Sequence, residues 1–372
     1  MEKKIKLLHV IDDQKFIPYC ERTFSLTALE NIFCSSKDFE TTISTEQFEV
    51  IVIHYLREEC IQVLNNRKIN APVVWFFWGA DGFCLGKFYN RFLLPATKRS
   101  RLLLAFKTSF KNGLKVLGKT YFPQSIDRNP FYKSLIQSFS KISVVVPIVP
   151  GDFDLLSENY PLRACSFHLN YVSPVFDSHH SLIVSGNNIL VGNSAHFSNN
   201  HIEIINILSK VGLGSRKVII PLSYGDRVNS RFIANYAMKK LPLNAVCLTD
   251  FLSFEEYQKI MQSCSIVIMN HLRQQALGNV IQALATGAQL FLQPSSTLYK
   301  YLKDKGFIIP TIEELKDIKP LLSEEREYNK RKCNEFFGKE LQHIKVKQLI
   351  ELALSQKPTG DAKEKNNLSL NY

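Results

Sequence analysis

The chain has 372 residues, 46 Lys and Arg against 34 Asp and Glu, and a formal net charge of +12. Hydrophobic residues make up 45% of it and aromatic residues 11%, which excludes a wholly disordered chain. It contains no uncharged apolar run of about 18 residues, so a transmembrane helix is not expected. Asp12 and Asp13 interrupt the first apolar stretch, which argues against a signal peptide. The eight cysteines form no CxxC pair, which predicts reduced thiols and a cytosolic location.

Short apolar segments recur along the chain and predict buried parallel strands. In the first half they are 6–11, 49–54, 73–78 and 143–149, with a weaker candidate at 165–169. In the second half they are 188–191, 217–222, 245–248, 265–269 and 289–292. Helical patterns lie between the later strands at 201–210, 229–239, 254–264 and 280–286, and one or two charged amphipathic helices are expected over 323–354.

This alternation predicts an α/β protein of two doubly wound, Rossmann-like domains that face a central cleft. A polar stretch over 176–185 separates the two series of elements. We therefore expect an N-terminal domain over 1–180, a C-terminal domain with closing helices over 181–355, and a disordered tail over 356–372. Ligands of such folds bind at the carboxyl ends of the strands, so the loops after the strands are where functional residues are expected.

A loop rich in small polar residues follows the predicted strand at 188–191. It includes Gly192, Asn193, Ser194, Ser198 and Asn199. Asn200 could cap the next helix, with Glu203 completing a capping box. Free backbone N–H groups and the helix dipole at such a place suit a phosphate. The alternative is an ordinary strand-to-helix loop with a good cap.

A second polar group precedes the helix that ends at Thr286. Arg273 offers a fork of donors matched to phosphate, and Gln274 and Gln275 suit sugar hydroxyls. Gly278 lies at the start of the same helix. The alternative is that these residues only cap the helix.

Two strand ends in the first half carry candidate catalytic side chains. Asp81 lies on a turn flanked by Gly79 and Gly82, after a strand rich in Trp and Phe. It is a candidate general base or sugar ligand, the alternative being a carboxylate that stabilises its own turn. His54 ends the neighbouring predicted strand and is a second candidate, although a structural role is the alternative there too.

The positive charge is concentrated in one window. Between Lys87 and Lys141 there are twelve Lys or Arg and a single acid, Asp127. Apolar residues recur at helical spacing over 103–117, which predicts one basic amphipathic helix. We expect it to face an anionic membrane surface, the alternative being a packed helix with a solvated lysine face. Nucleic acid is a competing partner that no recognised motif supports. The expected membrane-facing residues are Arg101, Lys107, Lys111 and Lys115.

Several stretches resemble the TDP-N-acetylfucosamine:lipid II N-acetylfucosaminyltransferases, also named 4-alpha-L-fucosyltransferases. The densest matches are FFWGAD (76–81), ILVGNS (189–194), SNNHI (198–202), VIIPLSYG (218–225) and RQQALG (273–278), within a weaker frame over about 5–355. Many enzymes of the wider class carry two Glu eight positions apart at the last helix, whereas this chain has Gln274 and Gln282. That departure weakens any inference about the choice of donor.

The resemblance implies a GT-B hexosyltransferase that needs no metal or other cofactor. It implies transfer of a 4-acetamido-4,6-dideoxyhexose or fucose-type sugar from a dTDP-sugar to an undecaprenyl-pyrophosphate-linked glycan. The setting would be surface polysaccharide synthesis of the enterobacterial common antigen kind, by a peripheral enzyme at the cytoplasmic face of the bacterial inner membrane.

By resemblance the second domain binds the donor, and the first domain presents His54 and Asp81 to the acceptor. Asp81 is the preferred base, and Arg273 with helix N-termini would stabilise the leaving diphosphate. The competing hypothesis is a non-catalytic GT-B-like scaffold docked on the membrane. The expected donor-binding residues are Gly192, Asn193, Ser194, Asn199, Arg273, Gln274, Gln275 and Gly278.

Overall fold

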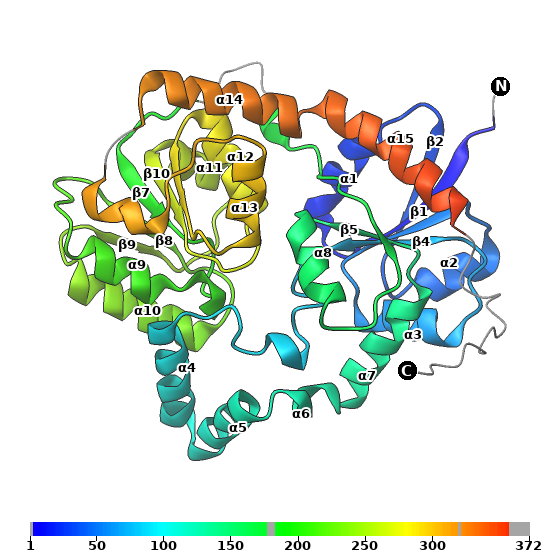
Figure 1. The fold of residues 1–372 in the computed structure, drawn as a ribbon, viewed down its shortest axis with the longest axis horizontal. Helices are drawn as coiled ribbons and strands as arrows, with labels where there is room; N and C mark the ends of the chain where they lie inside the picture. Colours follow the sequence, from blue (N-terminus) through cyan, green and yellow to red (C-terminus); the bar gives the residue numbers. More distant parts are fainter. Residues whose placement is uncertain (1–2, 177–182, 319–320, 357–372) are drawn as a thin grey trace, which may run out of the picture.

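Two parallel sheets form the body of the molecule (Figure 1). The computed structural model describes residues 3–176, 183–318 and 321–356. The first sheet has the spatial order β2-β1-β3-β4-β5-β6, and all its pairings are parallel. Its strands are β1 (Ile5–Val10), β2 (Leu29–Cys34), β3 (Val50–His54), β4 (Val73–Phe77), β5 (Val144–Pro147) and β6 (Cys165–Ser166).

The second sheet has the order β11-β10-β7-β8-β9 and is also parallel throughout. Its strands are β7 (Asn188–Val191), β8 (Val218–Pro221), β9 (Ala245–Leu248), β10 (Cys264–Met269) and β11 (Gln289–Leu292). The predicted strands are confirmed to within a few residues, and so is the α/β class. The sequence prediction missed β2, since it is an edge strand in which Glu30 and Asn31 interrupt the apolar pattern.

Helices cover both faces of the first sheet. The core on one face includes Trp75, Phe77 and Phe139, and the core on the other includes Phe76 and Val146. The helices that follow its strands are α1 (Ile17–Thr23), α2 (Phe39–Thr45), α3 (Glu58–Asn66) and α8 (Pro150–Ser157).

The helices of the second half likewise follow the strands of their own sheet, except for the last helix. They are α9 (His201–Leu208), α10 (Arg227–Lys240), α11 (Phe254–Gln262), α12 (Leu277–Thr286), α13 (Thr297–Asp304) and α14 (Ser323–Phe337). The exception is α15 (Lys339–Ser355), which crosses back along the top of Figure 1 and packs Val346, Leu349 and Ile350 into the core of the first sheet. The division proposed from sequence placed this helix in the second domain. The proposed boundary at 180/181 and nearly all of the proposed tail lie outside the described residues.

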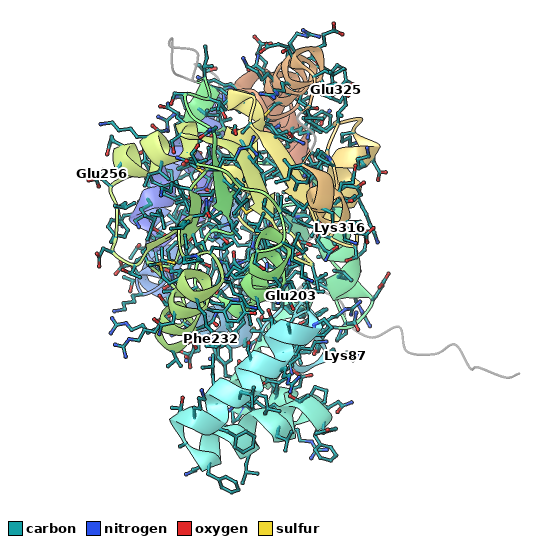
Figure 2. The ribbon with its side chains drawn as sticks, turned by 90° about the vertical axis from the view of Figure 1, so that its left-hand side faces the viewer. Lys87, Glu203, Phe232, Glu256, Lys316 and Glu325 are labelled. Atoms are coloured by element: carbon teal, nitrogen blue, oxygen red, sulfur yellow. The ribbon has the colours of Figure 1, made fainter. Side chains whose placement is uncertain are left out.

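A helical arm leaves the first half between β4 and β5. It consists of α4 (Pro95–Thr108), α5 (Phe110–Tyr121), α6 (Gln124–Asp127) and α7 (Pro130–Ser138), which run beneath both sheets in Figure 1. Figure 2 shows α4 and α5 projecting beyond the body of the molecule.

The single basic helix expected over 103–117 is wrong, because the backbone is extended at Ser109. The Ser109 hydroxyl accepts a hydrogen bond from Asn112 N and starts a new helix. The two helices then fold against each other, with Phe106 packed on Gly113. Within the described residues, no helix is both long and apolar enough to cross a membrane.

Candidate active site between the two sheets

A cavity of about 640 Å³ lies between the carboxyl ends of the two sheets. The first half contributes Lys15 and Phe16, just after β1, and Tyr19 and Arg22 of α1. The second half contributes the loops after β7, β8 and β9 and the start of α12. The principal lining residues from this half are Asn193, Ser223, Tyr224, Phe251, Phe254, Tyr257, Gly278, Asn279 and Gln282. The volume is in the range of sites that enclose a small-molecule ligand, about 300–1,000 Å³.

The N-terminus of α12 forms one wall of this cavity. Ala276 adopts a left-handed backbone conformation (φ 55°), which turns the chain into the helix without a side-chain cap. Asn279 Nδ2 donates to Tyr257 Oη over 2.8 Å. One turn further along the helix, Gln282 lines the cavity with only 8% of its surface exposed, and its Nε2 has no hydrogen-bond partner within the described chain. A buried donor without a partner is costly, so this amide is a place where a ligand oxygen would be favourable.

The buried side chain of Asn199 holds the loop after β7 in place through hydrogen bonds. Its Oδ1 accepts hydrogen bonds from Asn193 N and from His271 Nε2, each with a length of 2.9 Å. Its Nδ2 donates a hydrogen bond of 3.1 Å to Ser194 Oγ. Gly192 has φ +69°, and a Cβ there would lie 2.6 Å from Asn199 Oδ1. Asn193 alone of these predicted donor-binding residues lines the cavity, with its Nδ2 bonded to Tyr224 Oη over 3.0 Å. Gly192, Ser194 and Asn199 therefore position the loop.

The capping box expected at Asn200 and Glu203 is wrong. Asn200 has a left-handed backbone (φ 49°) and makes no capping bond to α9. Its side chain instead accepts from Leu94 N (2.8 Å) and donates to Phe92 O (3.2 Å), both in the first half. Glu203 accepts from Thr97 N and Thr97 Oγ1, over 3.0 and 2.7 Å. These two side chains therefore fasten the N-terminus of α4 to the second half (Glu203 is labelled in Figure 2).

Arg273 lies in the interface between the halves and is not on the cavity wall. It is 7% exposed, and its guanidinium carbon is 5.4 and 5.7 Å from the ring centres of Phe83 and Phe92. Its Nη1 donates to the carbonyl of Gln274 and lies where a side chain at Gly79 would begin. Burial lowers its pKa, while the nearby carboxylates of Asp152 and Asp81 oppose that shift.

The two glutamines beside Arg273 also bond within the protein. Gln274 N donates to Thr297 Oγ1 (2.9 Å), which in turn donates to Asp152 Oδ1 (2.7 Å). Gln275 Oε1 accepts from Ser198 Oγ (2.7 Å). In this structure neither glutamine lines the cavity, whereas Gly278 does.

Asp81 is held inside the first half at the turn after β4. Its Oδ2 accepts from Leu56 N (3.0 Å) and Trp75 Nε1 (2.8 Å), while its Oδ1 is buried without a partner in the described chain. Burial raises the pKa of this carboxyl to about 6, against the lowering effect of the two donors. It is 3% exposed and does not line the cavity.

His54 is part of a buried network of hydrogen-bonded side chains. Tyr171 Oη accepts from Trp78 Nε1 (3.2 Å) and bonds His54 Nδ1 (2.6 Å). On the other side His54 Nε2 contacts His9 Nδ1 (3.0 Å), and His9 Nε2 contacts the acceptor oxygen of Asn31 (3.0 Å). Because Asn31 accepts, His9 and His54 both carry the proton on Nε2, and Tyr171 donates to His54. Burial lowers the pKa of His54 well below its ordinary value, so the ring is neutral and both nitrogens are occupied.

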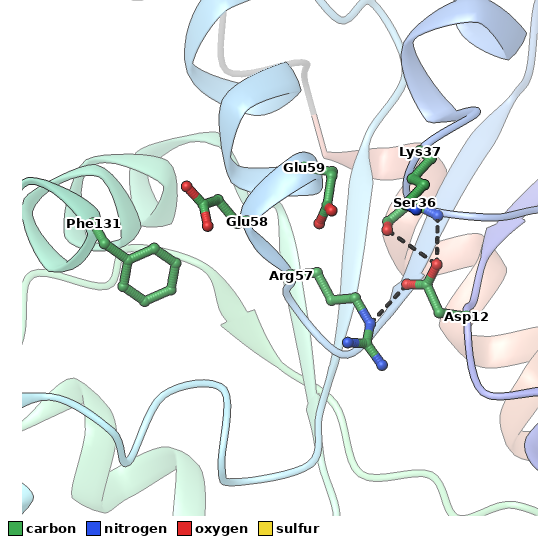
Figure 3. A pocket seen from close by; sticks show the side chains of 7 residues that line it. All are labelled: Asp12, Ser36, Lys37, Arg57, Glu58, Glu59 and Phe131. Atoms are coloured by element: carbon green, nitrogen blue, oxygen red, sulfur yellow. Dashed lines mark hydrogen bonds and ion pairs between the residues drawn. The ribbon is translucent and has the colours of Figure 1, made fainter.

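A smaller hollow of about 430 Å³ is lined mainly by residues that follow β1, β2 and β3 (Figure 3). Asp12 Oδ1 accepts hydrogen bonds from the N and the Oγ of Ser36, each 3.0 Å long. Asp12 Oδ2 forms an ion pair with Arg57 Nε at 2.7 Å. These polar groups satisfy one another. In the part of the chain that is described, no three His, Cys, Asp or Glu side chains gather as a metal site would require.

The arm carries the residues expected to face a membrane. Lys107, Lys111 and Lys115 are exposed. Arg101 is not, because its guanidinium donates to Asn90 Oδ1 and lies over the rings of Tyr89 and Phe197. Apolar side chains that the charge pattern did not single out are exposed on the same helices and at their end: Leu103, Phe110, Leu114, Tyr121 and Phe122.

Sequence reasoning missed most of the cavity wall. Lys15 had a detectable signal, because it follows a predicted strand at its carboxyl end. Tyr224 and Phe251 had a similar signal, because they lie in the loops after the second and third predicted strands of the second half. What no local pattern shows is that these three loops converge on one cavity.

Comparison with known proteins adds independent evidence. Residues 165–316 match the model of the family described as 4-alpha-L-fucosyltransferase glycosyl transferase group 56. A glycosyltransferase from Rickettsia africae superposes with a TM-score of 0.60 at 10% identity, covering 95% of this chain and 99% of that one. The trehalose-6-phosphate synthase OtsA gives 0.58 at 10% identity, with 93% and 83% covered. The Escherichia coli trehalose-6-phosphate structure bound with UDP-2-fluoro glucose gives 0.54 at 10% identity, with 93% and 84% covered.

These structures are similar in fold and confirm the expected GT-B architecture, while the family match confirms the resemblance found in the motifs. Within the match lie the loop after β7, the loops after β8 and β9, and the whole of α12. The chain therefore has the GT-B fold, and its residues 165–316 are similar to the 4-alpha-L-fucosyltransferase group 56.

Proposed function

We propose that this protein is a glycosyltransferase that moves a 4-acetamido-4,6-dideoxyhexose or fucose-type sugar from a dTDP-sugar to an undecaprenyl-pyrophosphate-linked glycan. The reaction would serve bacterial surface polysaccharide synthesis of the enterobacterial common antigen kind. The observation that carries the proposal is the cavity between the sheets, with the α12 N-terminus and the unpartnered Gln282 amide on its wall. The family match over the same half supports it.

The donor occupies the second-half wall in this proposal. Its diphosphate lies at the N-terminus of α12, near Gly278 and Asn279, where backbone N–H groups and the helix dipole favour negative charge. Asn193 projects from the loop after β7 toward the same space. The exposed rings of Tyr224 and Phe251 offer apolar surface for the nucleoside.

Asp81 is the proposed general base on the acceptor side. A carboxyl with a pKa of about 6 and one unpartnered oxygen suits proton abstraction near neutral pH. The Arg273 guanidinium, which lies against the neighbouring Gly79, would have to shift before an acceptor could reach the carboxylate. We assign His54 a structural role, since both its nitrogens are bonded within the protein.

The arm is the proposed contact with the membrane, at the cytoplasmic face of the inner membrane. Exposed lysines on α4 and α5 complement anionic headgroups. Phe110 and Phe122, 72% and 69% exposed, lie at the two ends of α5 and could enter the interface. A polyprenyl-linked acceptor would then be held close to the carboxyl edge of the first sheet.

A panel of nucleotide sugars with a polyprenyl-diphosphate-linked acceptor tests the transfer. The expected result is a glycolipid heavier by one deoxysugar with the dTDP donor, detected by mass spectrometry. Binding of dTDP without transfer to any acceptor would instead support the scaffold hypothesis. Failure to bind any nucleoside diphosphate at millimolar concentration would contradict both the donor site and the enzyme assignment built on it.

Sedimentation with vesicles tests the arm. Replacing its three exposed lysines by Ala should weaken binding to phosphatidylglycerol vesicles about 100-fold, since each lysine contributes roughly 1 kcal/mol. A matched control removes the same charge from exposed positions of the second half, and equal losses would contradict the arm as the docking surface. The test variant is Lys107→Ala, Lys111→Ala, Lys115→Ala, and the control is Lys210→Ala, Lys239→Ala, Lys303→Ala.

A further inference from the structure

The charges on the cavity wall are distributed unevenly between the two halves. Among the described residues that line the cavity there is no Asp or Glu, and the cations are Lys15 and Arg22, both from the first half. The second half brings neutral donors, namely amides, hydroxyls and the helix N-terminus. Its Arg273 is buried against Phe83 and Phe92. A strongly anionic ligand in this cavity would therefore meet its cationic partner from the first half.

Lys15 is placed to meet such a ligand. It lies in a short 3-10 helix, Gln14–Phe16, directly after β1, and its backbone N–H donates to Asp13 Oδ1 over 3.1 Å. The backbone is thus held at the carboxyl edge of the first sheet while the side chain is exposed. Its Nζ lies 4.5 Å from the ring centre of Phe251, which belongs to the second half. The lysine therefore reaches across the cavity from one half to the other.

We propose that Lys15 binds a diphosphate in the cavity and neutralises the charge that develops as the glycosidic bond to the donor breaks. This inference rests on the proposed function. An ammonium beside a leaving diphosphate interacts most strongly when the anion carries its full charge, which is after bond cleavage. In the proposed step the bond between the anomeric carbon and the diphosphate oxygen breaks as the acceptor oxygen bonds to that carbon. The electron pair of the broken bond stays on the diphosphate oxygen, next to Lys15, and the proton of the acceptor hydroxyl passes to Asp81.

Phe251 gives the lysine a resting position. A cation lying over an exposed ring gains about 0.5–1 kcal/mol, and 71% of the Phe251 surface is exposed. A charge-assisted hydrogen bond is worth about 1.5–3 kcal/mol. The ammonium therefore exchanges the ring for an incoming phosphate oxygen, and the ring becomes free to contact the nucleoside.

Two diphosphates are present in the proposed reaction, one in the donor and one in the lipid-linked acceptor. The neutral donors at the start of α12 face the same cavity as Lys15. That shared space favours the donor diphosphate, because one anion can contact both walls. The diphosphate of the acceptor is the other source that an experiment has to separate.

The test compares Lys15→Ala, Lys15→Arg and a control, Lys37→Ala, which removes another exposed lysine at the smaller hollow of the same half. Titration calorimetry with dTDP should show about 10–100-fold weaker binding for Lys15→Ala, partial recovery for Lys15→Arg, and little change for the control. Unchanged thermal unfolding would show that the loss is local.

Steady-state kinetics separate the two sources. A raised KM for the acceptor with unchanged dTDP affinity would assign Lys15 to the acceptor diphosphate. Wild-type values for binding, kcat and both KM in Lys15→Ala would overturn the proposal while leaving the proposed function intact. If the wild-type protein itself bound no dTDP and transferred no sugar, the proposed function would fail, and the Lys15 site with it.

Discussion

The carboxyl edges of the two sheets have polar residues at equivalent places but use them differently. At the edge of the first sheet, His54 and Asp81 are covered and bonded to protein groups. At the edge of the second sheet, Asn193 and Asn279 face a cavity, and the Gln282 amide has a donor without a partner in the described residues. In this structure the second edge therefore presents these polar groups to the cavity, whereas His54 and Asp81 do not line it and the first half reaches it through Lys15, Phe16 and α1.

The contrast shows that the position of a residue at a strand end does not decide its role. Strand-end polar residues in a parallel sheet either bind a ligand or hold the loops that shape the ligand site. Asn199 illustrates the second role, since its amide organises the loop on which Asn193 is presented. What separates the two residues is that Asn193 lines the cavity and Asn199 does not.

The largest expected effect concerns Asp81, and it would show that a buried side chain at the edge of the first sheet takes part in catalysis. Replacing Asp81 by Asn should lower kcat about 10²–10⁴-fold if the carboxylate is the base. Wild-type activity should rise as pH increases through about 6, because the pKa of Asp81 is raised to about 6 and only the ionised form accepts a proton. Near wild-type turnover of Asp81→Asn would remove the base assignment.

A second substitution tests whether His54 is structural. His54→Ala leaves the Tyr171 hydroxyl and a ring nitrogen of His9 without their partner, and each buried loss costs about 1–3 kcal/mol. We expect the free energy of unfolding in urea to fall by about 2–5 kcal/mol, with kcat per folded molecule within a few-fold of wild type at low temperature. A large drop in kcat with unchanged stability would contradict this.

The third prediction concerns the loop after β7. Gly192→Ala should cost about 1–3 kcal/mol of stability, because alanine is strained at φ +69° and its Cβ would meet Asn199 Oδ1. Affinity for dTDP should fall as well. Gly212→Ala is the matched control, since open space surrounds that position and its backbone is unstrained. Equal melting temperatures for the two variants would show that the loop is not held as described.

The smallest expected effect distinguishes an interface role of Arg273 from a ligand role. Arg273→Lys keeps the charge but loses the guanidinium that contacts the adjoining rings of Phe83 and Phe92, which should cost about 1 kcal/mol in thermal unfolding. Affinity for dTDP should change less than about 3-fold, since these contacts are made within the protein. A loss of affinity above 10-fold with normal stability would show that Arg273 leaves the interface to bind the donor.

The sequence was sufficient for the architecture because apolar strands buried on both faces leave an unmistakable local pattern. It failed at β2, where an edge strand carries Glu30 and Asn31, and at Ser109, where a continuous apolar stripe hides a break between two helices. Both failures have the same cause. Propensity and periodicity describe one segment, whereas edge position and helix-on-helix packing depend on other segments.

The positions of the predicted site loops can be compared with the structure, while their role in binding stays a prediction. The loops at 192–199 and 273–278 do lie at the carboxyl edge of the second sheet. The chemistry of Arg273 suits both a phosphate and a pair of aromatic rings, and only the position of Phe83 and Phe92 shows which of them it contacts here. Asn200 likewise satisfies every local rule for a helix cap while bonding to a segment more than a hundred residues away.

The crossing of α15 has a practical consequence for anyone who wants to study one half by itself. A fragment that stopped near residue 180 would lack Val346, Leu349 and Ile350 and would leave Leu7, Phe24 and Val52 without their cover. The complementary fragment would lack the backbone N–H groups of Leu94 and Thr97, from which Asn200 and Glu203 accept hydrogen bonds. Neither piece would be self-sufficient, so dissection requires a circularly permuted gene or co-expression of both fragments.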